Sequence, residues 1–160
     1  MAVDIFIKIG DLKGDSIDDG HKDEIEVLGF NIGATQNGTM HTATGGGAGK
    51  VSVQDLSVTK WVDKSSPNLF LACCNGKNMK EAVLTVRKAG EKPLEYLKLT
   101  MKDVIVSSIS TAGHGSEERL TETVTLNFGK LKVGYTPQKP DGSGDAEVEG
   151  GWDVAANVAM

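Results

Sequence analysis

Apolar and polar residues alternate along most of this 160-residue chain, and a period of two is typical of half-buried β-strands. The alternation predicts a first strand at Ile5–Ile9, which Gly10 and Asp11 end. The polar segment Asp15–Lys22 then predicts a loop. A second strand is predicted at Glu24–Gly33, so the chain opens as two short strands joined by a polar connection.

Alternation divides the second strand into a bulky apolar face and a small uncharged face. The apolar face is formed by Leu28, Phe30 and Ile32. The small face is formed by Gly29, Asn31 and Gly33. A face without bulk or charge is unsuited to a core. We therefore expect it to line a wide cavity or to let another backbone approach closely, with contact to a neighbouring loop as the alternative.

Val51–Val62 predicts a third strand whose alternation changes phase between Val53 and Leu56, which indicates a bulge or a sheet corner. The only clear helix signal follows it. That signal has Ser66 as the N-cap candidate, Pro67 at the first helical position and Gly76 as the stop.

The remaining segments again alternate, and they predict strands at 82–87, 95–111 and 120–135, with a second phase change at Gly129. One face of the 95–111 strand is predicted to hold Leu97, Leu99, Met101, Ile105 and Ile109. The sequence thus predicts a mainly β fold, a small antiparallel β-barrel or two-sheet barrel with one short flanking α-helix. We expect a single domain over residues 1–160, with a flexible C-terminal tail from about residue 136.

Composition narrows the function classes. Hydrophobic residues make up 39% of the chain and charged residues 24%, which is ordinary for a folded domain. The formal net charge of −5 disfavours nucleic-acid binding, and no apolar run is long enough to span or insert into a membrane. The N-terminus has no apolar run of signal-peptide length, so we expect synthesis in the cytoplasm without a cleaved signal. The adjacent Cys73 and Cys74 are expected to be reduced thiols in or near the core.

The segment from Thr44 to Lys50 resembles a phosphate-binding loop at first sight, because glycines precede a Gly-Lys pair. Two of its positions do not fit the pattern: Thr44 stands where glycine is required, and Val51 stands where Ser or Thr should hold the metal ion. A helix should also follow, whereas the residues after Lys50 predict a strand. The alternative is an exposed hairpin connection, which we expect here.

Other chemistry is sparse. His21, His41 and His114 lie in polar or glycine-rich segments without a second ligand nearby, so we expect solvated loop histidines. We expect no catalytic residues, no metal and no cofactor. Because catalytic triads need not be local in sequence, a small hydrolase or a monomeric β-barrel binding module remains the alternative function.

Two long β-forming runs, 51–59 and 120–128, carry Thr and Ser on their outer faces. Strands of this kind have edges that need partners, and pairing between subunits would supply them. The residues predicted at such a subunit interface are Val51, Val53, Thr121, Thr123 and Thr125.

Several segments, in the same order through nearly the whole chain, resemble the haemolysin-coregulated protein (Hcp) family of bacterial type VI secretion. They are "MAVDIFIKIGDLKGDS" at 1–16, "GGGAGKVSVQDLSVTK" at 45–60, "DKSSPNLFLAC" at 63–73, "RKAG" at 87–90 and "EERLTETVTLNFGKLKVGYTPQK" at 117–139. The resemblance implies a non-enzymatic β-barrel protomer with a flanking helix. It also implies a hexameric ring that stacks into a tube related to phage tail tubes.

The resemblance further implies secretion of the tube from the cell and partners that include effector proteins, a spike protein and a contractile sheath. It gives the glycine-rich segment a role in contacts with neighbouring protomers or with the next ring. The residues expected there are Thr44, Gly45, Gly46, Gly47, Ala48, Gly49 and Lys50. The small face of Gly29, Asn31 and Gly33 becomes a candidate lumen wall for weak contact with effectors. Over the tail beyond Asp141 we carry only Trp152 from the resemblance, as a packing anchor.

Overall fold

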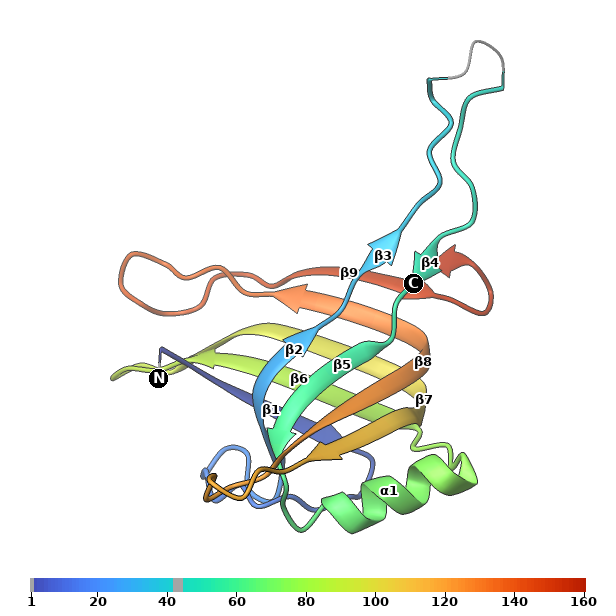
Figure 1. The fold of residues 1–160 in the computed structure, drawn as a ribbon. Helices are drawn as coiled ribbons and strands as arrows, with labels where there is room; N and C mark the ends of the chain where they lie inside the picture. Colours follow the sequence, from blue (N-terminus) through green and yellow to red (C-terminus); the bar gives the residue numbers. More distant parts are fainter. Residues whose placement is uncertain (1, 42–44) are drawn as a thin grey trace.

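Six antiparallel strands close into a barrel in the computed structural model, which describes residues 2–41 and 45–160 (Figure 1). Around the barrel the order is β8-β5-β2-β1-β6-β7, and β7 pairs back with β8. The six strands are β1 (Val3–Ile9), β2 (Ile25–Asn31), β5 (Leu56–Trp61), β6 (Glu81–Lys88), β7 (Leu94–Ala112) and β8 (Thr121–Tyr135). The barrel and its single helix confirm the fold class that the sequence predicts.

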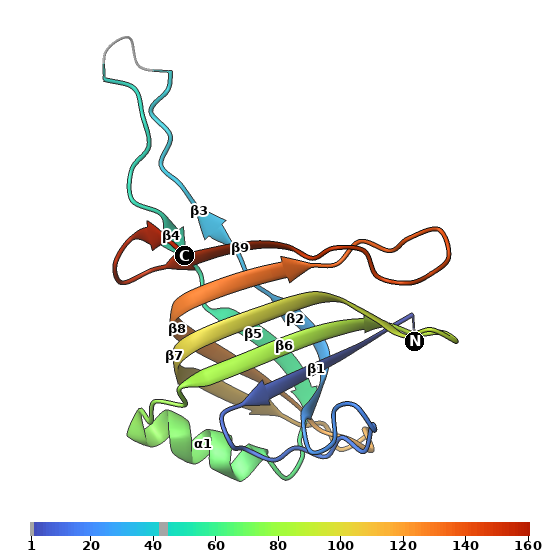
Figure 2. The ribbon, with the colours of Figure 1, turned by 180° about the vertical axis from the view of Figure 1, so that it is seen from behind.

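A long β-hairpin, described over residues 34–41 and 45–53, leaves the barrel between β2 and β5; we call it the arm. Its root is a separate two-stranded sheet of β3 (Ala34–Thr35) and β4 (Ser52–Val53). A single bridge between Gly38 and Ala48 continues the pairing outward. The phase change predicted between Val53 and Leu56 is therefore the junction between the arm and β5. Figures 1 and 2 show the arm standing clear of the barrel.

Buried side chains from all six strands fill the barrel. The fully enclosed ones include Ile7, Ile25, Leu56, Leu84, Met101 and Leu126. The long strand β7 departs from the predicted alternation, because Val104 and Val106 are buried in place of Ile105. The physical reason is Asp103, whose φ of 55° is left-handed and shifts the alternation by one residue.

A β-bulge between Val27 and Gly29 makes a second departure, because it inserts Leu28 as an extra residue opposite β5. Leu28 is 37% exposed, so its predicted place in the core is wrong. Phe30 and Ile32, beyond the bulge, do pack against the core as expected.

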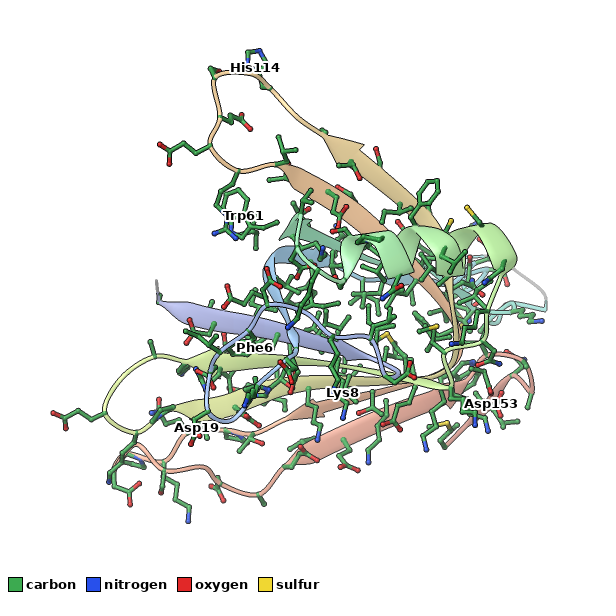
Figure 3. All side chains as sticks on the ribbon, turned by 90° about the horizontal axis from the view of Figure 1, so that it is seen from below. Phe6, Lys8, Asp19, Trp61, His114 and Asp153 are labelled. Atoms are coloured by element: carbon green, nitrogen blue, oxygen red, sulfur yellow. The ribbon has the colours of Figure 1, made fainter. Side chains whose placement is uncertain are left out.

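The helix α1 (Ser66–Asn75) lies across the end of the barrel opposite the arm, with Leu69 buried (Figures 1 and 3). Gly76 ends it in a left-handed conformation, φ 63°, as predicted. The N-cap is Ser65 and not Ser66. The Ser66 hydroxyl is instead engaged with Asp63 and Glu122, so it does not cap the helix.

The tail predicted to be flexible contains two strands, β9 (Val148–Asp153) and β10 (Val158–Ala159). β9 pairs with the second half of β8, from Lys130 to Tyr135, and so extends the sheet past the barrel.

A buried ion pair ties the start of α1 to the barrel. Lys60 on β5 is 1% exposed, and its Nζ lies 2.5 Å from Glu122 Oε1 on β8 and 3.1 Å from Asp63 Oδ1. The hydroxyls of Ser66 and Thr111 donate to the same Glu122 carboxylate. Each buried charge thus has an opposite charge and hydrogen-bond partners, which burial requires.

A second charged cluster holds the loop between β1 and β2 on the outside of the barrel. His21 is only 6% exposed and stacks on Phe6 with 4.4 Å between ring centroids. The guanidinium of Arg87 lies 5.2 Å from the same ring centroid and donates to Asp18 and Asp4. The prediction that His21 is a solvated loop histidine is therefore wrong, because its loop folds back over Phe6.

We predict that Lys60→Ala lowers the free energy of unfolding by about 3–5 kcal/mol, because it leaves Glu122 buried without its cation. Replacing all three charges, Lys60→Met with Glu122→Leu and Asp63→Asn, should cost far less, because no buried charge is left without a partner. Urea unfolding measures both variants, with Lys64→Ala, in a half-exposed ion pair, as the matched control. A loss for Lys60→Ala no larger than for the control would contradict the assignment.

Asp18 should make part of the stability depend on pH. The Arg87 guanidinium lowers the pKa of Asp18 from 3.8 to about 2. The stabilisation is complete above the unfolded pKa of 3.8 and is lost as the pH falls toward about 2. We predict that Asp18→Asn flattens the stability–pH curve in this window and costs about 1 kcal/mol or less at pH 7, since the pair is partly exposed. Acid unfolding of Asp18→Asn beside the exposed neighbour Asp19→Asn tests it; equal curves for both would refute it.

Candidate functional site

The outward side chains of β2, β5, β8 and β7 form two aligned rows. Directly opposed residues of antiparallel strands point to the same side of the sheet. The first row is Asn31, Ser57, Thr125 and Ser108, and the second is Gly29, Thr59, Thr123 and Ser110. We call these eight residues the hydroxyl face. The intervening residues, such as Val58 and Val124, are buried in the barrel, which confirms that the rows point outward.

The structure thus brings together residues to which the sequence assigned different roles. Gly29 and Asn31, predicted as lumen wall, share one face with Thr123 and Thr125, predicted as subunit interface. A Cβ built on Gly29 meets nothing within 4 Å, so the face is open there. Gly33 lies beyond the end of β2, beside the side chain of Gln54.

Four members of the face, namely Ser57, Thr59, Ser108 and Ser110, were not among the predicted site residues. The alternation of Ser57 and Thr59 with buried Leu56 and Val58 was a visible signal for the first two. Alternation with Ile109, which packs against the core, likewise puts Ser108 and Ser110 on the outer side of β7, but the bulge between Val106 and Ser108 sets their register with β8.

The argument that the Thr-rich strands carry free edges is wrong. β5 pairs with β2 and β8, and β8 pairs with β5, β7 and β9, because barrel closure makes both strands central. Thr121 likewise lies opposite Trp61 on one side and Ala112 on the other. Val51 and Val53 lie in the arm and not on the barrel.

Free edges belong to β2 and β7 instead. β1 pairs with β2 only at Ile25 and Glu26, and β6 pairs with β7 only as far as Lys102. Among the residues that the structure describes, no strand covers the second edge of β2 over 28–31 or of β7 over 105–112. These two edges flank the four-stranded sheet β2-β5-β8-β7 on opposite sides, and the hydroxyl face lies between them.

The glycine-rich segment lies on the side of the arm that leads back into β4. Gly45, Gly46, Ala48, Gly49 and Lys50 are exposed, and Gly47 is half-buried against Thr39. The chain continues from it into β4, so the helix that a phosphate-binding loop requires is replaced by a strand. Thr44 lies outside the described residues.

An apolar groove of about 510 Å³ lies where the arm joins the barrel. Its walls come from the end of β2, from the arm and from the sheet of β8 and β9. Its apolar side chains are Ile32, Ala34, Val51, Val53, Leu131, Val133, Trp152 and Val154. Trp152, expected as a packing anchor, is thus part of a surface groove.

The titratable groups suggest little chemistry. Within residues 2–41 and 45–160, no cluster of His, Cys, Asp and Glu could hold a metal ion. Hydrogen bonding between the exposed Glu147 and Glu149 raises the pKa of Glu147 and lowers that of Glu149. The thiols of Cys73 and Cys74 are both free. Cys73 packs against the core as expected, whereas Cys74 is exposed and the expectation is wrong for it. No helix in the described chain is long and apolar enough to cross a membrane.

Comparisons of the sequence and of the structure with known proteins agree on one family. Residues 6–135 match the protein family described as "Type VI secretion system effector, Hcp". "Protein hcp1" of Pseudomonas aeruginosa is 58% identical over 160 residues, which cover 99% of each chain. The crystal structure of Hcp1 from Salmonella typhimurium aligns over 100% of both chains with 38% identity and a TM-score of 0.81. A structure described as a type six secretion system protein aligns over 99% of this chain and 100% of its own, with 32% identity and a TM-score of 0.94.

The similarity in sequence and in fold therefore extends over nearly the whole chain. The chain belongs to the Hcp family and is a tube subunit of a type VI secretion system.

Proposed function

We propose that six copies of this chain form a ring, that rings stack into a secreted tube, and that the tube carries effector proteins in its lumen without catalysing a reaction. The hydroxyl face, set between two free strand edges, is the observation that supports this proposal. Made in the cytoplasm, the tube would carry a spike protein at its tip and would be propelled out of the cell by a contractile sheath.

The two free edges suit ring closure. Neighbours in the sheet β2-β5-β8-β7 are antiparallel, so β7 runs opposite to β2. Placing β7 of one copy beside β2 of the next therefore continues the antiparallel order without turning any copy over. Such a contact uses two different surfaces of each protomer, and contacts of this kind close into rings when the rotation allows it.

In such a ring the hydroxyl face looks into the lumen. A surface that meets bulk water normally mixes charges of both signs. Charged pairs of that kind lie elsewhere on this barrel, for example Lys102 with Glu81 and Lys132 with Glu149. Short hydroxyl and amide side chains would instead allow weak contact with many different effectors. On this proposal Thr123 and Thr125 face the lumen and not a subunit interface, and Val51 and Val53 stay proposed interface residues.

The arm suits contact between rings. It projects from the barrel, and its glycines let it lie flat against another backbone. Lys50, exposed between the Gly38–Ala48 bridge and β4, could meet a carboxylate of the next ring.

We predict that Asn31→Arg preserves the ring but reduces the amount of effector protein that co-purifies with it. The channel has room for the longer side chain, and six guanidinium groups would narrow the wall and add charge to it. Light scattering measures the oligomer, and quantitative mass spectrometry measures the effectors. The matched control is Asn78→Arg, an exposed position in the turn before β6.

A wild-type protein that stays monomeric would contradict the ring and favour a β-barrel binding module. A ring of Asn31→Arg that retained every effector at the wild-type level would instead show that Asn31 does not contact cargo.

Deleting Gly45–Gly47 should leave the ring intact and strongly reduce secretion of the protein into the medium, because the shortened arm no longer reaches the next ring. Light scattering checks the ring, and immunoblotting of the medium checks secretion.

Isothermal titration of the wild type with ATP and magnesium should give no heat above dilution. Normal secretion by the deletion variant, or micromolar ATP binding, would refute this role for the arm.

A further inference from the structure

Asp55 places a carboxylate at the edge of the hydroxyl face. It directly precedes β5, and strand alternation puts it on the same side of the sheet as Ser57. Asn127 on β8 donates from Nδ2 to Asp55 Oδ1 over 2.8 Å. Ser107 on β7 donates from Oγ to Asp55 Oδ2, also over 2.8 Å. The carboxylate therefore lies on the outer side of the sheet, next to the hydroxyl face.

The charge of Asp55 is held in place, but no cation matches it. Among residues 2–41 and 45–160, no Lys, Arg or His forms an ion pair with Asp55. Glu122, by contrast, is matched by Lys60 inside the barrel. Each carboxylate oxygen can accept two hydrogen bonds, so each oxygen of Asp55 has room for a further donor. Both existing bonds lie at the exposed surface, where a cationic group of another molecule can reach the carboxylate.

Asp55 gives the hydroxyl face a preference that its own residues lack. None of the eight residues of that face carries a charge. Hydroxyl and amide groups both donate and accept hydrogen bonds, so they do not distinguish an acidic partner from a basic one. A fixed carboxylate does distinguish them, because it attracts one and repels the other.

Ring symmetry would strengthen this preference. In the proposed ring the same carboxylate recurs six times around the channel. Charges of one sign on a concave wall concentrate their field and raise the local concentration of oppositely charged partners. One residue per copy would therefore set the sign of the electrostatic potential along that part of the lumen.

We propose that Asp55 determines specificity at the effector-binding face, and that it favours effector proteins whose surfaces are rich in Lys and Arg. Their cationic groups would bind Asp55, while the neighbouring hydroxyls would contact the rest of the effector surface. Effectors with acidic surfaces would be repelled. This inference rests on the proposed function, and it names the class of effector that the channel accepts.

Two short fluorescent peptides test the sign of the preference. One alternates Lys with Ser, and the other alternates Glu with Ser. Fluorescence anisotropy with the assembled wild-type protein should show tighter binding of the Lys peptide. Asp55→Asn keeps the size of the side chain and removes its charge, so it should weaken binding of the Lys peptide about fivefold or more. The Glu peptide should bind to Asp55→Asn at least as well as to the wild type.

Asp19→Asn is the matched control, because it removes one exposed carboxylate per copy from the loop outside the barrel (Figure 3). It changes the net charge by the same amount and should leave the binding of both peptides unchanged. If Asp55 served only to tie β5 to Asn127 and Ser107, its replacement would weaken both peptides alike or reduce assembly in light scattering. Either result, or unchanged binding of the Lys peptide by Asp55→Asn, would overturn the proposal.

Charge reversal extends the test to effectors. Asp55→Lys should lower the average isoelectric point of the proteins that co-purify with the ring, as quantitative mass spectrometry measures. Asp55→Glu keeps the charge and should retain the wild-type set. A ring of Asp55→Lys that carried the same proteins as the wild type would contradict the assignment.

The outcomes separate the two proposals. A hexamer whose peptide binding does not depend on Asp55 would overturn the role of Asp55 and leave the ring standing. A wild-type chain that stays monomeric at every concentration would overturn both.

Discussion

The architecture depends on the pairing of β7 with β8, the two strands that are long enough to belong to both sides of the barrel. The first half of β7 also pairs with β6, and the first half of β8 also pairs with β5. At the bend, Asp103 is left-handed, and Gly129 packs against it without a side chain of its own. Because β7 turns away from β6 at this bend, its second half keeps a free edge. The bend in β7 therefore both lets the barrel close and leaves the second edge of β7 over 105–112 without a partner strand.

The charges are distributed so that this arrangement is stable and one face stays neutral. Lys60 and Glu122 lie buried where α1 meets the barrel, and the pair holds the start of the helix in place. The cluster of Arg87, Phe6 and His21 covers the outside of β1 and β6. Neither cluster reaches the rows from Asn31 to Ser108 and from Gly29 to Ser110. The neutral face is therefore a distinct surface, and at Asn31 it adjoins Ile32 of the apolar groove.

Local signals predicted much of the fold. Alternation in β6, Pro67 and Gly76 in the helix, and the glycine-rich arm all appear in the structure as expected. The errors arise where a single residue shifts the alternation or where distant contacts decide. A bulge places Leu28 outside the core. The left-handed backbone at Asp103 shifts the alternation of β7, so that Val104 and Val106 are buried in place of Ile105. The burial of His21 depends on Phe6 and Arg87, which are distant in sequence.

The candidate site was predictable only in part. Alternation alone placed Gly29 and Asn31 on a small uncharged face. The extension of this face to β5, β8 and β7 depends on strand register, which single-strand patterns do not contain. For the same reason the Thr-rich outer faces of Thr123 and Thr125 suggested free edges, whereas the register makes β8 a central strand. The alternation of residues identified a small uncharged outer surface, and the pairing of the strands decided which residues belong to it.

Electron cryo-microscopy of the purified protein tests the central claim most directly, namely that the hydroxyl face lines the channel of a ring. We expect a sixfold ring in which β2, β5, β8 and β7 surround the opening, with Asn31 and Thr123 pointing into it. A ring in which these strands face the outside, with the charged residues of β6 toward the channel, would contradict the account.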